Sequence, residues 1–170
     1  MTAVGQVKRA VAAAIKAAGC AAIESYSEEQ LKRYAAAVAA VGTKETVIEE
    51  SGAAQYLGEK VDEATQDTVS VYGRKMLLTL LIEVYAPRTL GAAGCEKAAE
   101  VVTQALMTAL PEGLKLGSLQ WGKTGWDKTT GMFRLDASAK YAAYFVAEAA
   151  EEDETVFTDF VLKGTVKERE

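Results

Sequence analysis

Residues 74–86 read RKMLLTLLIEVYA, and this stretch decides the fold. Its even positions from 76 to 84 are all apolar, whereas the odd positions include Lys75, Thr79 and Glu83. An alternation with a period of two predicts a long β-strand that packs one face on a core. Pro87 ends the strand, because proline cannot donate a hydrogen bond to a neighbouring strand.

A second stretch with the same period lies near the end of the chain. Over residues 133–145 the odd positions are apolar or alanine, and the even positions include Arg134, Asp136 and Lys140. This pattern predicts a second long strand, and a third is expected over about residues 155–166.

Two amphipathic helices are expected to cover the core face of these strands. Apolar side chains recur at helical spacing over residues 4–18, and Gly19 ends that helix. The same spacing runs through residues 95–109, and Pro111 and Gly113 close the second helix. The order of elements predicts a single α+β domain over residues 1–170. Its antiparallel or mixed β-sheet has long strands packed against the two amphipathic helices.

The region between the first helix and the first long strand gives weaker signals. Residues 21–25 fit a short strand, and Ser27 with Gln30 forms a capping box that begins a helical turn. Residues 34–41 fit either a helix or a strand, because their alanines favour helix while the β-branched residues that follow favour strands. Residues 51–68 are expected to form a long loop or excursion.

Composition excludes several classes of function. The 170-residue chain has no histidine, which removes the commonest general base and the commonest metal ligand. Cys20 and Cys95 lie far apart without C-x-x-C spacing, so we expect two buried thiols in a reducing compartment rather than a zinc or redox site. A net charge of −5 without a basic cluster argues against general nucleic-acid binding. We therefore expect no enzyme activity, no cofactor and no bound metal.

The N-terminus has some features of a secretion signal. Lys8 and Arg9 precede an apolar stretch, and residues 17–20 read AAGC, like a lipoprotein cleavage site. Lys16 shortens that stretch to about six residues, which is less than a signal peptide needs. No window reaches transmembrane length, so a soluble cytoplasmic protein is expected.

Gly117, Gly122, Lys123 and Thr124 match the spacing G-x-x-x-x-G-K-[ST] of a phosphate-binding loop. Such a loop needs a strand before it and a helix that opens at the Lys-Thr pair. The residues before Gly117 leave little room for a strand, and those after Thr124 are typical of turns. A hairpin is the favoured interpretation, and a nucleotide-binding enzyme is the alternative.

The polar face of the second long strand is a candidate interface. Its candidate residues are Arg134, Ser138 and Lys140, together with the aromatic pair Trp121 and Trp126. The two tryptophans lie five residues apart across a glycine turn and could face one side, as in a small-ligand or peptide binding module. Packing in the core or in the hairpin is the favoured interpretation for both. Strands of this length exceed the cover that two helices provide, which favours pairing with further copies.

The chain resembles the phage tail terminator family, whose members form rings that cap the tail tube. The likeness lies in residues 77–87 (LLTLLIEVYAP), the bend over residues 88–94, the helix that ends in Ala105-Leu106, residues 119–122 (LQWG) and residues 157–164 (FTDFVLKG). It spans residues 34–166. The resemblance implies an α+β fold, a hexameric ring, no catalysis and no cofactor.

The same resemblance leads to expectations about partners and location. A tail terminator, or a closely related tail or neck component, would assemble with itself as a homohexamer. Its other partners would be tube, sheath or neck proteins, with no sequence-specific nucleic-acid binding and no membrane. The protein would reside in a virion or a phage-tail-like particle assembled in the bacterial host cytoplasm. Whether the source is an infectious phage or a phage-derived bacteriocin stays open.

Overall fold

A computed structural model describes residues 3–24, 27–50, 55–61, 66–111 and 113–147. The chain divides into two compact units, of which unit 1 is Met1–Val47 with Met76–Ala143 and unit 2 is Ile48–Lys75 with Tyr144–Glu170. The strand predicted over residues 155–166 lies outside the described residues. The elements in chain order are α1 (Ala3–Ala17), β1 (Ala21–Ile23), α2 (Glu28–Leu31), β2 (Val38–Glu49), β3 (Tyr56–Val61), β4 (Thr68–Ala86), α3 (Gly91–Thr108), β5 (Lys115–Trp121), β6 (Gly125–Asp127) and β7 (Met132–Ala147).

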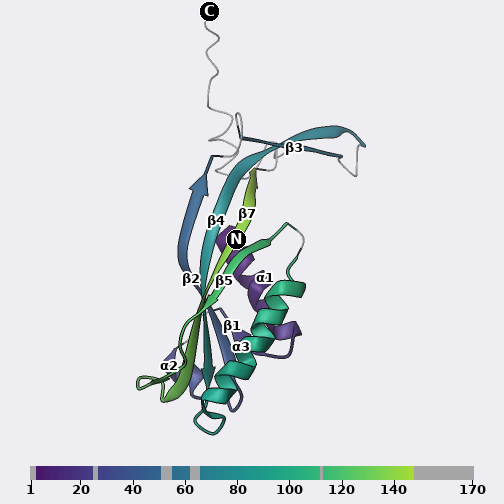
Figure 1. The fold of residues 1–170 in the computed structure, drawn as a ribbon. Coiled ribbons are helices and arrows are strands. Elements are labelled where there is room, and N and C mark those ends of the chain that lie inside the picture. The colour runs from purple at the N-terminus through teal and green to yellow at the C-terminus, as the bar shows by residue number, and fades with distance from the viewer. Residues whose placement is uncertain (1–2, 25–26, 51–54, 62–65, 112, 148–170) are drawn as a thin grey trace, which may run out of the picture. The chain divides into compact units, whose positions relative to one another are not determined.

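The strands form one mixed sheet of seven, which confirms the predicted α+β class. Its order is β1-β2-β4-β7-β5, while β3 pairs with β4 and β6 pairs with β7 (Figure 1). β1 runs parallel to β2, whereas β5 and β6 both run antiparallel to β7. The two long strands β4 and β7 therefore occupy the middle of the sheet.

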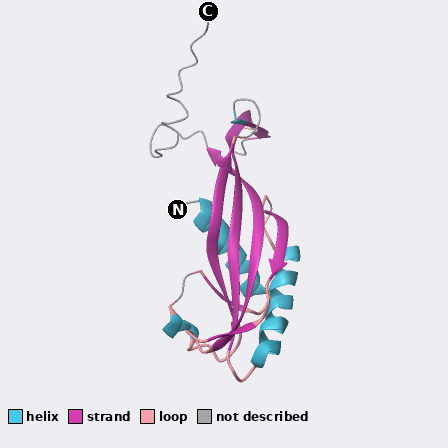
Figure 2. Cartoon of the chain, turned by 60° about the vertical axis from the view of Figure 1, so that its left-hand side comes forward, coloured by secondary structure: helices cyan, strands magenta, loops and turns pink. Residues whose placement is uncertain are grey.

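In unit 1, α1 and α3 lie side by side on one face of the sheet (Figures 1 and 2). The predicted glycine stop of α1 is confirmed, because Gly19 adopts a φ of 93° and its N–H donates to the carbonyl of Lys16 at 3.0 Å. The core between helices and sheet takes the even residues of β4 and the odd residues of β7. Its buried side chains include Val11, Ile15, Leu78, Leu80, Ile82, Val84, Cys95, Val102, Leu106, Leu135, Ala137, Ala139 and Tyr141.

The opposite face of the same sheet carries a second, smaller core at one end. Leu31, Val38, Ala40, Tyr85 and Met132 are buried together there. The adjoining helix α2 begins at a capped residue, because the Ser27 hydroxyl accepts from the N–H of Gln30 as the sequence predicts. The C-terminal part of β4 is thus buried on both faces, and the prediction of a strand with one core face is wrong there.

In the first half of the chain, the structure decides one open alternative and corrects one prediction. The ambiguous residues 34–41 lead into the strand β2, and no helix forms over them in the described residues. Of the long loop or excursion expected over residues 51–68, the loop is wrong, because β3 lies within this stretch and pairs antiparallel with the start of β4. Within unit 2, Tyr56 lies opposite Tyr72 in this ribbon, and their rings meet edge to face with centroids 5.7 Å apart.

Candidate functional site

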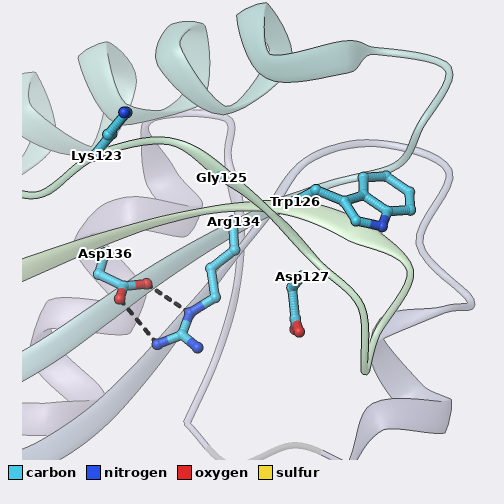
Figure 3. A pocket seen from close by; sticks show the side chains of 6 residues that line it. All are labelled: Lys123, Gly125, Trp126, Asp127, Arg134 and Asp136. Carbon is cyan, nitrogen blue, oxygen red and sulfur yellow. Dashed lines mark hydrogen bonds and ion pairs between the residues drawn. The ribbon is translucent and has the colours of Figure 1, made fainter.

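A shallow hollow of about 250 Å³ lies at the edge of unit 1 around β6 (Figure 3). Figure 3 shows Asp127, Arg134 and Asp136 pointing to one side of the strands, while Lys123 points to the other side, toward α3. The lining residues are Lys123, Gly125, Trp126, Asp127, Arg134 and Asp136. Charged side chains of both signs therefore line this hollow together with the exposed Trp126.

Arg134 is held by two carboxylates on neighbouring strands. Its Nε lies 2.6 Å from Oδ1 of Asp136 and its Nη2 lies 2.9 Å from Oδ2, a bidentate pair on β7. The same Nη2 lies 2.7 Å from Oε1 of Glu83 on β4, whose side chain is only 9% exposed. The hydroxyl of Tyr85 also donates to Glu83, at 3.3 Å. The guanidinium is therefore occupied by the protein's own carboxylates, and the cluster ties β4 to β7.

Asp127 closes the turn that joins β6 to β7. Its carboxylate accepts from the N–H of Thr129 at 3.0 Å and from the hydroxyl of Thr130 at 2.8 Å. Burial alone would raise the pKa of this carboxyl, but the hydrogen bonds from Thr130 and Thr129 outweigh it and lower the pKa below its ordinary value of 3.8. The carboxylate is therefore a structural part of the turn.

The two tryptophans pack in the core and in the hairpin, which confirms the favoured interpretation over a shared binding site. Trp121 packs against the core, and its Nε1 donates to Oγ1 of Thr103 on α3 at 3.0 Å. Trp126 is 45% exposed and meets Phe133 edge to face, with centroids 5.1 Å apart. They lie opposite Ala137 and Phe133 of β7, four residues apart, which is about 13 Å along the strand. They share a side of the sheet without forming one binding site.

The other three candidate interface residues share one face of β7. Arg134, Ser138 and Lys140 alternate with the core residues of β7, so they share the face opposite α1 and α3. Most of this face has no described helix over it (Figure 2). We call its part beyond the Arg134 cluster the bare face, and it comprises Gly42, Lys44, Leu77, Thr79, Leu81, Ser138 and Lys140.

The residues that match a phosphate-loop spacing connect two strands. Gly117 lies in β5, and the three residues Gly122, Lys123 and Thr124 lead directly into β6. The N–H of Gly122 donates to the carbonyl of Asp136 at 2.7 Å. No helix begins at this point, so the backbone donors and dipole that would hold a phosphate are absent from these described residues. The hairpin itself is formed by β6 and β7.

Both thiols are free and buried in unit 1. Burial raises the pKa of Cys20, and burial likewise raises the pKa of Cys95 to about 11. The Cys95 thiol donates to the carbonyl of Phe133 at 3.2 Å. Thiols of this kind stay protonated at neutral pH and are poor nucleophiles.

Two kinds of feature are absent from the described part of the chain. No group of three or more His, Cys, Asp or Glu residues there could hold a metal ion. None of the helices there is both long and apolar enough to cross a membrane.

Sequence reasoning missed Glu83, Tyr85, Asp127 and Asp136 as parts of this edge. One signal was present in the sequence, because Arg134 and Asp136 are two residues apart and therefore share a strand face. The contact with Glu83 depends on the pairing of β4 with β7, which no local pattern shows.

Neither a protein-family model nor a curated protein matches the sequence, whereas 26 chains of solved structures do. One of these chains belongs to the virion of a native gene transfer agent particle. Its sequence is 19% identical and its TM-score is 0.38. The match covers 84% of this chain and 92% of the other. Another belongs to an extracellular contractile injection system, the PVC sheath/tube terminator in its extended state. It is 12% identical with a TM-score of 0.47, and the match covers all of this chain and 65% of the other. With TM-scores below 0.5 and identities below 25%, neither match is evidence for the function of this chain.

Proposed function

We propose that this chain is a structural protein of a phage tail or a phage-tail-like particle, a tail terminator or a closely related tail or neck component that forms a homohexameric ring. The observation that carries the proposal is a sheet of long strands that α1 and α3 cover on one face, while the opposite face meets only the short helix α2, at one end, in the described residues. β4 has 19 residues, β7 has 16 and β2 has 12, against a usual length of about 5 or 6. A sheet of this size gains stability when its open face and edge contact further copies.

The edge of the sheet at β2 supports the same proposal. β1 pairs only with Val38, Ala39 and Ala40, and no other described strand adjoins this edge of β2. The remaining residues of β2 therefore present backbone donors and acceptors to a neighbour. Contacts between unlike surfaces of identical copies produce a ring when the rotation closes.

The residues that carry the family resemblance support the tail role. Residues 77–86 belong to β4, Ala105 and Leu106 belong to α3, and residues 119–121 belong to β5. β4 and α3 contribute buried residues to the main core of unit 1, and Leu119 and Trp121 of β5 pack against it. The resemblance thus covers elements that set the architecture rather than surface loops.

A structural role without catalysis is also the role that the chemistry of unit 1 favours. The buried thiols are protonated, the Arg134 guanidinium is occupied, and the phosphate-loop residues lead into a strand. A calorimetric titration with ATP or GTP and magnesium tests the nucleotide alternative. Micromolar binding that Lys123→Ala removes would contradict a purely structural role.

Light scattering coupled to size exclusion tests the ring directly. We expect a mass near six times the 18.1 kDa of one chain, alone or after mixing with purified tail-tube protein, and ring-shaped particles by negative-stain microscopy. Tube protein without this chain is the control. A mass of one chain at every concentration, with and without tube protein, would overturn the proposal.

A further inference from the structure

Within unit 1, the sheet has two edges where the described strands leave backbone groups unpaired. At one edge, β1 pairs with Val38, Ala39 and Ala40, and β2 then continues through Val47 with no described strand on its outer side. At the other edge, β5 and β6 follow one another along β7, and no described strand lies beyond them. We call this second edge the β5–β6 edge. Unpaired edges of this kind can bind a strand of another chain.

The part of β2 that has no described strand on its outer side, residues 43–47, carries one charge of each sign. We call it the free stretch, and its side chains are exposed. Where β2 is buried, its odd positions lie in the main core and its even positions lie in the smaller core. The alternation therefore places Glu45 on the side of α1 and α3, which we call the helix side. Lys44 lies on the opposite side, which we call the far side.

The hollow at the β5–β6 edge has the reverse arrangement of charge. Lys123 is exposed and points toward α3, on the helix side (Figure 3). Asp127 and Asp136 point to the far side, where Arg134 also binds Glu83. Three carboxylates there stand against one guanidinium, so the far side of the hollow is negative. On each side, the free stretch of β2 and this hollow carry opposite charges, which favours their contact.

Both edges also expose an apolar side chain on the helix side. Val47 has the same parity as Glu45 in β2 and is 40% exposed. Trp126 is 45% exposed and lies opposite Phe133 of β7, which packs against the main core. Loss of water from these two side chains would add a contribution that salt does not screen, because exposed ion pairs alone contribute little.

We infer that the free stretch of β2 in one copy docks against the β5–β6 edge of a second copy, so that the sheet continues from copy to copy. This inference rests on the proposed ring, for which it names the two edges that meet. Rotation about the axis of a ring keeps the helix sides of all copies in one orientation. Lys44 would therefore face the carboxylates of the hollow, while Glu45 would face Lys123.

An exchange of the two charges tests this contact at constant net charge. Lys44→Glu with Glu45→Lys reverses the sign on each side of the free stretch, and we expect this variant to need about tenfold more protein to assemble. Lys97→Glu with Glu100→Lys exchanges two exposed charges of α3 and should stay within about twofold of wild type. Sedimentation velocity over a range of protein concentrations measures assembly, with tube protein present if assembly needs it. Thermal unfolding checks that both variants remain folded.

A second pair of changes tests which residues meet. Glu45→Lys and Lys123→Glu each place like charges at the contact, so each alone should weaken assembly. Combined in one chain, they should restore assembly to within about threefold of wild type, because every copy then presents both reversed partners. A combined variant as weak as the two separate effects multiplied together would show that these residues do not meet, and the inference would be wrong.

Crosslinking of engineered cysteines tests the contact covalently. Thr46→Cys and Ser118→Cys place exposed thiols on the far side of the two edges. Within one copy β4 and β7 separate these positions by three strand spacings, or about 14 Å. In the chain with both changes, a short bismaleimide should therefore join copies into a ladder of up to six chains. Each single variant should stay uncrosslinked, and a mixture of the two should stop at dimers. Wild type, whose two cysteines are buried, is the control for the reagent.

The outcomes separate this contact from the ring itself. A ring by light scattering whose double-cysteine chain gives no ladder would overturn the contact and leave the ring. Covalent dimers of Thr46→Cys alone would show that β2 meets β2, which also overturns the contact. A chain that stays monomeric with tube protein would overturn the ring and the contact together.

Discussion

Nη2 of Arg134 lies 2.7 Å from Oε1 of Glu83 and joins β7 to β4 on the sheet face that α1 and α3 leave uncovered. Glu83 is nearly buried, so its carboxylate needs a counter-charge and hydrogen bonds in place of water. Arg134 supplies the charge, and its second carboxylate partner, Asp136, fixes the plane of the guanidinium. The cluster thus fastens the two central strands beside the smaller core that contains Leu31 of α2.

Arg134→Met should lower the free energy of unfolding by about 1–3 kcal/mol, because the Glu83 carboxylate loses its cation while it stays buried. Tyr85 still donates to Glu83, which keeps the loss within that range. Chemical denaturation of the purified variant and of wild type measures this change in the free energy of unfolding. Lys140→Met, an exposed change on the same strand face, should stay within about 0.5 kcal/mol of wild type.

Adding Glu83→Gln to Arg134→Met should recover part of the loss, because a neutral amide needs no counter-charge. A double variant that is less stable than either single variant would show that the ion pair is not the source of the effect.

Asp127→Asn should lower the free energy of unfolding by about 0.5–1.5 kcal/mol at neutral pH, because the turn loses its charged acceptor. The pKa of Asp127 is lower in the folded state than its ordinary value of 3.8, so its stabilising contribution is present above that value and is lost as the pH falls through the folded pKa. Melting temperatures of wild type and variant should therefore differ at pH 7 and converge in acid. A constant difference down to pH 2 would contradict this account.

Tyr141→Phe should leave the free energy of unfolding unchanged or raise it by about 1 kcal/mol. The Tyr141 ring is 2% exposed, and its hydroxyl has no hydrogen-bond partner within the described structure. Burial also raises the pKa of this phenol, which keeps it neutral. Removing an unsatisfied buried hydroxyl removes its desolvation penalty. Tyr144→Phe, at an exposed position, is the control, and a clear loss of stability in Tyr141→Phe alone would reveal a partner for the hydroxyl, such as a buried water.

The long strands and the two long helices could be predicted because each keeps a periodic contrast between its faces. The strand β2 could not be predicted in this way, since Val38 and Ala40 lie in the smaller core while Ala39 and Val41 lie in the main core. A strand buried on both faces has no alternation, and its alanines then favour helix by intrinsic preference. Tertiary pairing overrides that preference here.

β3 was missed for a different reason. Gly58 adopts a φ of 139°, and the register shifts between Tyr56 and Gly58, so the alternation is interrupted within six residues. At the candidate site, the shared face of Arg134, Ser138 and Lys140 followed from the period of β7. The contact between Arg134 and Glu83 of β4 could not be predicted from this period, because strand order in a sheet depends on the whole chain.

Leu135→Asp and Ser138→Asp separate the two faces of β7. Leu135 is 5% exposed in the helix-covered core, so a carboxylate there would be buried without a partner and should cost several kcal/mol, a large part of the roughly 5–15 kcal/mol that stabilises a typical domain. Ser138 lies half-buried on the bare face, so Ser138→Asp should leave the monomer folded with a melting temperature close to that of wild type.

Circular dichroism during heating provides the comparison, and light scattering of the same samples separates folding from assembly. If the bare face is a contact between copies, Ser138→Asp lowers the assembled mass without lowering the melting temperature of the monomer. Equal destabilisation of the monomer by both changes would mean that β7 is packed on both faces at Ser138, and the bare face would then be part of the core.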